Sequence, residues 1–203
     1  MKLIGMLDSP YVRRVAITAK RLGIALEHES VSVFRHFEQF QQINPVVKAP
    51  TLVLDDGQVL MDSTLIIDYL EALAKPGRSL MPALLNQRLR SLRLIGLALA
   101  ASEKSVQLYY ERNLRPADIQ YEPWVERVQG QLAAAYSSLE QELEKQPLKT
   151  DGEIDQAGIT LAVAWSFTNL VVPDQVTDEK FHRIAAFTAY AEGLEVFVST
   201  PID

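Results

Sequence analysis

The hydrophobic pattern of the chain changes at residues 75–87, and this change constrains the fold more than any other feature of the sequence. The segment, KPGRSLMPALLNQ, contains two prolines and a glycine and interrupts the periodicity on both sides. Strand and helix signals alternate before it, and long helical patterns follow it. We therefore expect a linker here, between an α+β domain at residues 1–76 and an all-helical domain at residues 86–203.

The first domain shows the signals of four strands and three helices. A short strand, KLIGM, precedes apolar residues at helical spacing over residues 12–22. Residues 25–33 have strand character, and a short helix is expected at residues 34–41. Residues 50–61, PTLVLDDGQVLM, contain two apolar runs joined by Asp-Asp-Gly, which predicts a β-hairpin. The amphipathic segment DSTLIIDYLEALAK then completes a predicted order of βαβαββα.

The second domain is predicted to consist of helices. Helical patterns cover residues 86–113, 119–146, 155–171 and 179–192. The third of them contains GITLAVAWSFTNL, which is apolar on every face. A helix this short with apolar residues all round is typical of the centre of a bundle, because a membrane span needs roughly 18 apolar residues.

Composition excludes several classes of function. The 203 residues include 20 Lys and Arg against 26 Asp and Glu, so the chain lacks the basic excess that nucleic acid would attract. No cysteine is present, which removes disulfides and thiolate metal ligands, and the 3 histidines are scattered, so no metal site or Ser-His-Asp arrangement is predicted. Since no signal peptide or membrane segment is expected, a cytoplasmic location is predicted.

The segment DSPYVRRV, residues 8–15, opens the first predicted helix. Pro10 fits the first turn of a helix, where its missing N–H costs nothing. Ser9 stands just before it and is a favoured N-cap residue. Its hydroxyl either caps the helix or faces a ligand, and the local sequence allows both interpretations.

Two later junctions between predicted elements also allow both a structural and a ligand-binding interpretation. Pro50 begins a predicted strand, either as an ordinary loop proline or after a cis peptide bond that exposes the backbone of Ala49 to an extended peptide. Asp62 and Ser63 precede the next helix. They are either N-cap residues or a site where free N–H groups bind a carboxylate and Asp62 binds an ammonium group.

These junctions occur in order in a βαβαββα half that precedes an all-helical half. Together with SPYVRRV, INPVVKAPTLVLDDG, DSTLIIDYLE and the closing STP, they make the chain resemble the glutathione S-transferase superfamily nearly end to end, as a bacterial serine-type member. The resemblance implies a thioredoxin-like first domain that binds glutathione as a co-substrate, an all-α second domain and a homodimer.

The resemblance also assigns roles to residues. Ser9 matches the residue that activates the thiol of glutathione. Ala49, before the cis proline Pro50, would bond the cysteinyl backbone. Ser63 would bind the γ-glutamyl carboxylate, with Asp62 near the amino group. The candidates for the glycyl carboxylate are Lys48, Arg35 and His36.

Elementary energetics support the role of Ser9. A free thiol has a pKa of about 8.5, so only a small fraction is thiolate at neutral pH. Lowering that pKa by about two units requires roughly 2.7 kcal/mol of preference for the anion. A charged hydrogen bond of about 1.5 to 3 kcal/mol, together with about 0.3 to 1 kcal/mol from the helix dipole, is of this order. Because serine replaces the cysteine of other members, thiol-disulfide exchange is disfavoured.

The second substrate is expected to be a small hydrophobic electrophile that lies against the helical domain. Its candidate contacts are Tyr11 and, from the segment LYYERNLRP, Tyr109, Tyr110 and Arg112. The alternative is that these tyrosines pack between helices and the arginine is solvated. The remaining histidine and tryptophan residues considered are expected to be structural: His28, His182, Trp124 and Trp165.

Four positions depart from the family pattern. Asp155 can cap its helix, but Gly158 stands where the family has an Asp that closes a capping box. Val47 replaces a glycine before the loop lysine, Ala49 replaces the usual valine before the cis proline, and Asp62 replaces the commoner Glu.

We expect a transferase that conjugates glutathione to electrophiles, as in detoxification. The alternatives are a glutathione-dependent isomerase or dehalogenase, and a non-catalytic module that binds a ligand or a protein through the same fold.

Overall fold

The computed structural model describes residues 1–202 and divides into two compact units. The first contains residues 1–80 and the C-terminal segment from Leu194, and the second contains residues 81–193. Each unit is described below by itself.

The first unit has the predicted order of elements, βαβαββα, followed at the end of the chain by one short helix. Its strands are β1 (Lys2–Ile4), β2 (Glu27–Glu29), β3 (Thr51–Val53) and β4 (Val59–Met61), and its helices are α1 (Pro10–Leu22), α2 (Phe37–Ile43), α3 (Ser63–Leu73) and α8 (Glu195–Val198). The predicted hairpin is confirmed as β3 and β4, which pair antiparallel.

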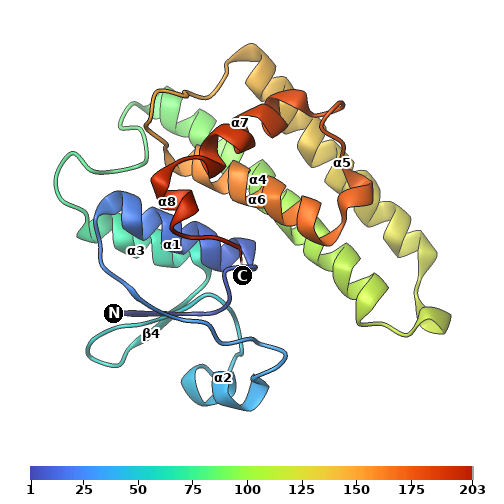
Figure 1. The fold of residues 1–203 in the computed structure, drawn as a ribbon, viewed down its shortest axis with the longest axis horizontal. Helices are drawn as coiled ribbons and strands as arrows, with labels where there is room; N and C mark the ends of the chain where they lie inside the picture. The colour runs from blue at the N-terminus through green and yellow to red at the C-terminus, as the bar shows by residue number, and fades with distance from the viewer. Residues whose placement is uncertain (203) are drawn as a thin grey trace. The chain divides into compact units, whose positions relative to one another are not determined.

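The four strands form one mixed sheet in the order β2-β1-β3-β4. β1 runs parallel to β2 and antiparallel to β3. Helices α1 and α3 pack together on one face of this sheet, and α2 lies on the other (Figure 1). Ile4 packs with Phe40 of α2, so Leu3 points to the opposite face by strand alternation. This arrangement confirms the predicted thioredoxin-like fold.

The second unit is built from helices, as predicted. They are α4 (Leu85–Asn113), α5 (Glu122–Lys145), α6 (Gln156–Val171) and α7 (His182–Glu192), with short 3₁₀ turns at Ala117–Ile119 and Pro173–Gln175. The apolar segment forms α6, which packs against α4 and α7 at the centre of this unit. Within residues 1–202, no helix has the length and apolar character needed to cross a membrane.

Buried hydroxyl groups in the second unit satisfy one another. Tyr136 donates or accepts a hydrogen bond with Thr168 at 2.6 Å, and Thr168 Oγ1 lies 2.7 Å from Ser105 Oγ. Burial raises the pKa of the Tyr136 hydroxyl, so it remains protonated. The network ties α4, α5 and α6 together without an unmatched polar group among these three side chains.

Two features differ from the sequence-based expectations. The sequence predicts that residues 194–202 belong to the helical domain, whereas in the structure they group with the first unit, where α8 packs on α1. Arg13 Nε donates to the carbonyl of Thr200 at 2.9 Å, which fixes this segment. The expectation that both tryptophans are packing residues holds for Trp165, which is 4% exposed, and is wrong for Trp124, which is 38% exposed near the start of α5.

Candidate functional site

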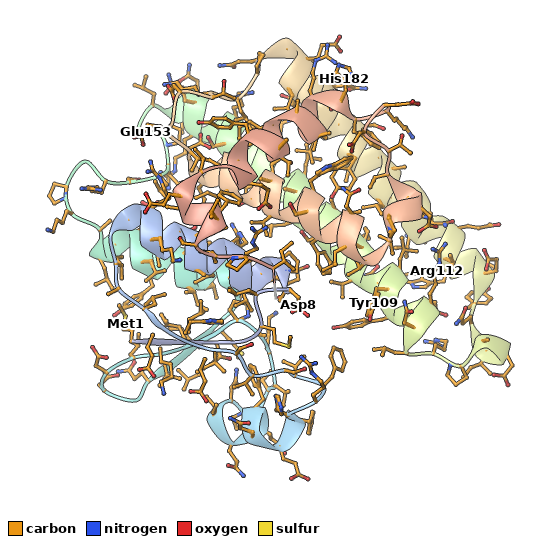
Figure 2. The ribbon with its side chains drawn as sticks, in the orientation of Figure 1. Met1, Asp8, Tyr109, Arg112, Glu153 and His182 are labelled. Atoms are coloured by element: carbon orange, nitrogen blue, oxygen red, sulfur yellow. The ribbon has the colours of Figure 1, made fainter. Side chains whose placement is uncertain are left out.

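The candidate site lies in the first unit, around the start of α1, the loop before β3 and the start of α3. Asp8, which precedes Ser9, marks this end of α1 in Figure 2. Side-chain contacts join the start of α3 to each of the other two segments. Lys48 Nζ lies 3.6 Å from a carboxylate oxygen of Asp62, and the Arg14 side chain reaches Ser63 at 2.9 Å.

Ser9 occupies the N-cap position of α1 with an extended backbone, φ −70° and ψ 122°. Its carbonyl oxygen accepts hydrogen bonds from the N–H groups of Val12 at 3.1 Å and Arg13 at 2.9 Å. Its hydroxyl makes no capping hydrogen bond to the described chain, and Pro10 has no N–H to offer. Ser9 therefore starts the helix through its backbone, and its half-buried hydroxyl sits at the positive end of the helix dipole.

The loop before β3 contains the cis peptide bond between Ala49 and Pro50, so the cis alternative is confirmed. A glycine makes room for this loop beside β1. Gly5 has φ +135°, and a Cβ atom there would lie 2.7 Å from Val12 Cγ2 and 3.2 Å from Ala49 Cβ. Only glycine accommodates both that backbone conformation and this close approach.

Val47, two residues before Ala49, adopts φ 52°. Positive φ is unfavourable for a β-branched residue, so this backbone is strained where the family pattern has glycine. Its N–H donates to the carbonyl of Asn44 at 2.8 Å, and its side chain packs against the apolar cluster around Phe40. These contacts hold the strained turn in place and direct the chain into Lys48 and Ala49.

At the start of α3, Asp62 and Ser63 take different positions. Asp62 is the N-cap, with φ 74°, and its carboxylate accepts a hydrogen bond from Thr64 N–H at 2.9 Å. Ser63 is the first helical residue and is 4% exposed. The N-cap interpretation therefore applies to Asp62, whose carboxylate also faces Lys48, while Ser63 contributes its hydroxyl from a buried position.

Arg14 is a component of this site that sequence reasoning missed. It is 2% exposed on α1, and its Nη1 donates to Ser63 Oγ at 2.9 Å and to Thr64 Oγ1 at 3.2 Å. Burial lowers the pKa of Arg14 to about 10, against the opposing charge of Asp62, so the guanidinium is charged at neutral pH. Arginine is mostly exposed in proteins, and the available signal was its position between Val12 and Val15, two apolar residues of an amphipathic helix.

The candidates near α2 make local contacts. His36 is the N-cap residue of α2, and its Nδ1 accepts a hydrogen bond from the backbone N–H of Ser32 at 3.3 Å. Arg35 Nη2 lies 3.1 Å from Met6 Sδ. Both side chains are exposed, so they can turn toward solvent or a ligand without losing core packing.

The remaining candidates are distributed over both units. Tyr11 is partly buried on α1 of the first unit. Tyr109 and Tyr110 lie on α4 of the second unit, are 36% and 41% exposed, and are not packed away in its core. Arg112 forms an ion pair with Asp174 at 3.0 Å, so its side chain is not simply solvated. To bind an anionic ligand, Arg112 would have to break this ion pair. Tyr109 and Arg112 are labelled in Figure 2.

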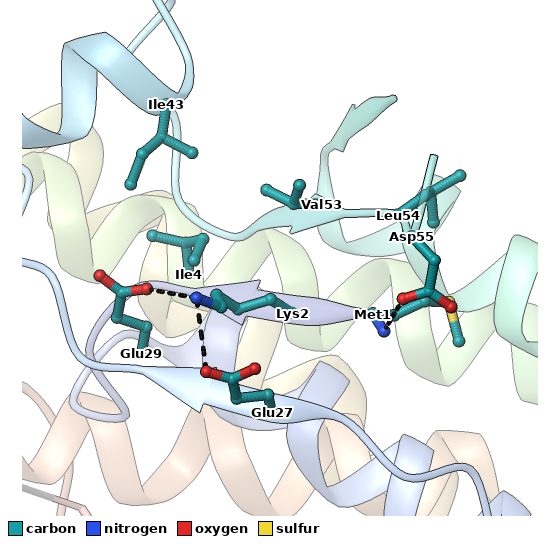
Figure 3. A pocket seen from close by; sticks show the side chains of 9 residues that line it. All are labelled: Met1, Lys2, Ile4, Glu27, Glu29, Ile43, Val53, Leu54 and Asp55. Carbon is teal, nitrogen blue, oxygen red and sulfur yellow. Dashed lines mark hydrogen bonds and ion pairs between the residues drawn. The ribbon is translucent and has the colours of Figure 1, made fainter. Parts of the chain in front are cut away.

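A cavity of about 360 Å³ lies elsewhere on the first unit, against β1, β2 and β3 (Figure 3). Its charged lining residues are paired with one another. Lys2 Nζ lies 3.3 Å from Glu27 and 3.2 Å from Glu29, and the N-terminal amine lies 2.6 Å from Asp55. None of the predicted site residues lines this cavity.

Among the side chains of residues 1–202, no group of three or more histidine or acidic residues is arranged to hold a metal ion. The candidate site contains hydroxyl groups, backbone groups at two helix starts, and the charges of Arg14, Lys48 and Asp62.

Comparison with known proteins gives consistent matches. A family model described as "Glutathione S-transferase, N-terminal domain" matches residues 3–78. The chain is 32% identical over 172 residues to the uncharacterized GST-like protein YibF of Escherichia coli K12, covering 83% of this chain and 82% of that protein.

Two solved structures of a glutathione transferase family member from Pseudomonas fluorescens Pf-5 are also similar, each at 29% identity. The one with bound glutathione has a TM-score of 0.86 and covers 100% of this chain and 98% of that chain. The one with bound S-(propanoic acid)-glutathione has a TM-score of 0.82 and covers 98% of each chain.

Proposed function

Because the chain belongs to the glutathione S-transferase superfamily, we propose that its first unit binds glutathione and that Ser9 stabilises the thiolate for attack on a small hydrophobic electrophile. The observation that carries this proposal is the Ser9 hydroxyl, which stands at the N-terminus of α1 without serving as its cap. A similar family member from Pseudomonas fluorescens Pf-5 has been solved with glutathione bound, which supports the choice of ligand.

The proposed binding mode uses the loop before β3 and the start of α3. The backbone of Ala49, before Pro50, pairs with the cysteinyl residue as an added strand would. Ser63 binds the γ-glutamyl carboxylate at the positive end of α3, and Asp62 attracts the neighbouring amino group. Lys48 is the proposed partner of the glycyl carboxylate, with His36 and Arg35 as the second choices on the α2 side.

The proposed chemistry needs one hydrogen bond and one helix end. The Ser9 O–H donates to the sulfur of glutathione, and this bond is stronger to the anion than to the neutral thiol. The dipole of α1, which has thirteen residues, favours the same anion. The thiol proton passes to solvent, and the thiolate attacks the electrophile to form a carbon–sulfur bond. In a substitution the leaving group departs with its bonding electron pair, and in an addition the displaced pair moves to the neighbouring carbon, which takes a proton from solvent.

The electrophile is proposed to contact Tyr109 and Tyr110 of the second unit. Their partly exposed rings offer apolar and edge-to-face contacts to an aromatic or alkyl substrate. Arg112 is proposed to exchange Asp174 for an anionic group on substrates that carry one.

A homodimer is the proposed assembly. Leu85, Leu89 and Leu92 are 82%, 67% and 51% exposed and form an apolar stripe along α4 at helical spacing. Exposed apolar residues gathered on one helix face are typical of protein–protein interfaces, which supports the proposed dimer.

Ultraviolet difference spectroscopy of the glutathione thiolate tests the proposal, with binding measured in parallel by calorimetry. Wild type should show thiolate at neutral pH. Ser9→Ala should bind glutathione but lose most of that signal, whereas Ser63→Ala should bind more weakly and regain the signal at saturating glutathione. Binding without thiolate in wild type would favour the non-catalytic alternative, and no binding would overturn the proposal.

A further inference from the structure

One of the methionine side chains lies in the loop that leads to Ser9. The chain contains no cysteine and 4 methionines, so thioethers are its sulfur groups that an oxidant can modify. Met6 belongs to the loop between β1 and α1, and its carbonyl oxygen accepts a hydrogen bond from the N–H of Ser9 at 3.2 Å. The residue is half-buried, so a small oxidant can reach its sulfur atom.

The sulfur atom of Met6 contacts a cation. Arg35 Nη2 lies 3.1 Å from Met6 Sδ, and because a guanidinium has donors only, the thioether is the acceptor. A thioether is a weak acceptor, and Arg35 is exposed. The guanidinium can therefore leave Met6 for the carboxylate of a ligand at little cost.

The backbone around Arg35 is held independently of this contact. Ser32 is 7% exposed, and its Oγ accepts hydrogen bonds from the N–H groups of Phe34 at 3.2 Å and Arg35 at 3.1 Å. The carbonyl of Ser32 also accepts from the N–H of His36 at 3.0 Å. A change in the acceptor at Met6 would thus act on the Arg35 side chain, without requiring this turn to move.

We propose that Met6 is a modification site for hydroperoxides, and that its oxidation holds Arg35 on the loop before α1. The sulfur attacks the outer oxygen of the hydroperoxide, the O–O bond breaks, and a sulfur–oxygen bond forms. Sulfur is oxidised to the sulfoxide, and the hydroperoxide is reduced to the alcohol, or to water in the case of hydrogen peroxide, after a proton moves to the departing oxygen. No further reactant is needed.

Oxidation replaces a weak acceptor by a polar one at the same position. The sulfoxide oxygen carries partial negative charge, so its hydrogen bond from the Arg35 guanidinium is charge-assisted and stronger than the bond to the thioether. Arg35 would then be less available to an anionic ligand. This consequence rests on the proposed function, in which Arg35 is one of the candidates to bind the glycyl carboxylate of glutathione.

The test measures oxidation and binding separately. The protein is treated with hydrogen peroxide, the peroxide is removed by desalting, and peptide mass spectrometry gives the sulfoxide content of each methionine. Met6 should be oxidised, and glutathione binding, measured by isothermal titration calorimetry, should weaken by about threefold to tenfold, as expected for losing part of a charged hydrogen bond. Methionine sulfoxide reductase should restore the affinity.

Two methionine variants locate the effect. Met6→Leu should bind glutathione as wild type does and keep its affinity after the same treatment. Met61→Leu is the matched control, because the sulfur of Met61 also accepts from a side chain, lying 3.7 Å from Asn44 Nδ2, but does not contact Arg35. Met61→Leu should lose affinity on oxidation as wild type does.

Arg35→Leu tests the route through the guanidinium. Before oxidation it should bind glutathione about as weakly as oxidised wild type, and peroxide should weaken it no further. The inference is overturned if Met6 stays reduced while Met61 is oxidised, if Met6→Leu loses as much affinity as wild type, or if Arg35→Leu weakens again on oxidation. Failure of untreated wild type to bind glutathione would instead overturn the proposed function, and the mass spectra would still show whether Met6 is the modified residue.

Discussion

Helices α1 and α6 both begin after a polar N-cap residue, but only one of the two side chains caps its helix. Asp155 at α6 and Ser9 at α1 both occupy the N-cap position with extended backbones. The Asp155 carboxylate accepts a hydrogen bond from the N–H of Gly158 at 2.8 Å, whereas the Ser9 hydroxyl has no capping bond within the described chain. A helix start that serves the fold satisfies its own donors, while α1 keeps a polar group available at its positive end.

The start of α6 also explains why Gly158 departs from the family pattern. A Cβ atom at Gly158 would lie 2.9 Å from both Ile154 Cγ1 and Phe187 Cζ. These distances are shorter than normal van der Waals contact, so the Asp that closes a capping box in relatives cannot be placed here without moving the core. The one-sided cap at Asp155 is the consequence of this close packing.

The largest expected effect comes from adding a methyl group at this contact. Gly158→Ala should lower the free energy of unfolding by about 1 to 3 kcal/mol, the usual cost of overpacking a core. Denaturant unfolding followed by tryptophan fluorescence measures it, because Trp124 and Trp165 both lie in the second unit.

Gly130→Ala is the control, since a Cβ at Gly130 on α5 meets no heavy atom within 4 Å. Removing a helical glycine without a clash should raise stability by about 0.5 to 1 kcal/mol. If both substitutions shifted stability in the same direction, packing at Gly158 would not be the reason for the glycine.

A smaller effect is expected from the cap itself. Asp155→Ala removes the acceptor for Gly158 N–H and should lower the free energy of unfolding by about 1 kcal/mol. Asp155→Asn retains an acceptor and should recover most of this loss. The same fluorescence measurement applies, and equal stability of the Asn and Ala variants would argue against a capping role.

Local patterns made much of the fold predictable. The β3 and β4 hairpin follows from two apolar runs around Asp-Asp-Gly, and the central position of α6 follows from apolar residues on every face. Asp155 was predicted as a cap because an N-cap depends on only the next few residues. These features are fixed by short segments of sequence, so they can be identified before any tertiary contact is known.

Features that depend on distant partners could not be predicted in this way. Arg14 meets Ser63 across 49 positions of sequence, and the clash that requires Gly158 comes partly from Phe187 on another helix. The attachment of the C-terminal segment to α1 depends on Arg13, whose burial contradicts the usual exposure of arginine. In each case the missing information was tertiary packing.

The smallest expected effect on stability is at Ser9, and it completes the comparison with Asp155. Because the Ser9 hydroxyl makes no capping bond to the chain as described, Ser9→Ala should change the free energy of unfolding by only a few tenths of a kcal/mol, well below the roughly 1 kcal/mol of a working cap. Far-ultraviolet circular dichroism during unfolding and hydrogen exchange at the Val12 and Arg13 amides report on α1 directly. A loss as large as that of Asp155→Ala would mean that the hydroxyl is committed to the helix. An unchanged stability together with a lost thiolate signal would mean that the Ser9 hydroxyl acts on the ligand. The start of α1 would then be stabilised by the backbone of Ser9 alone.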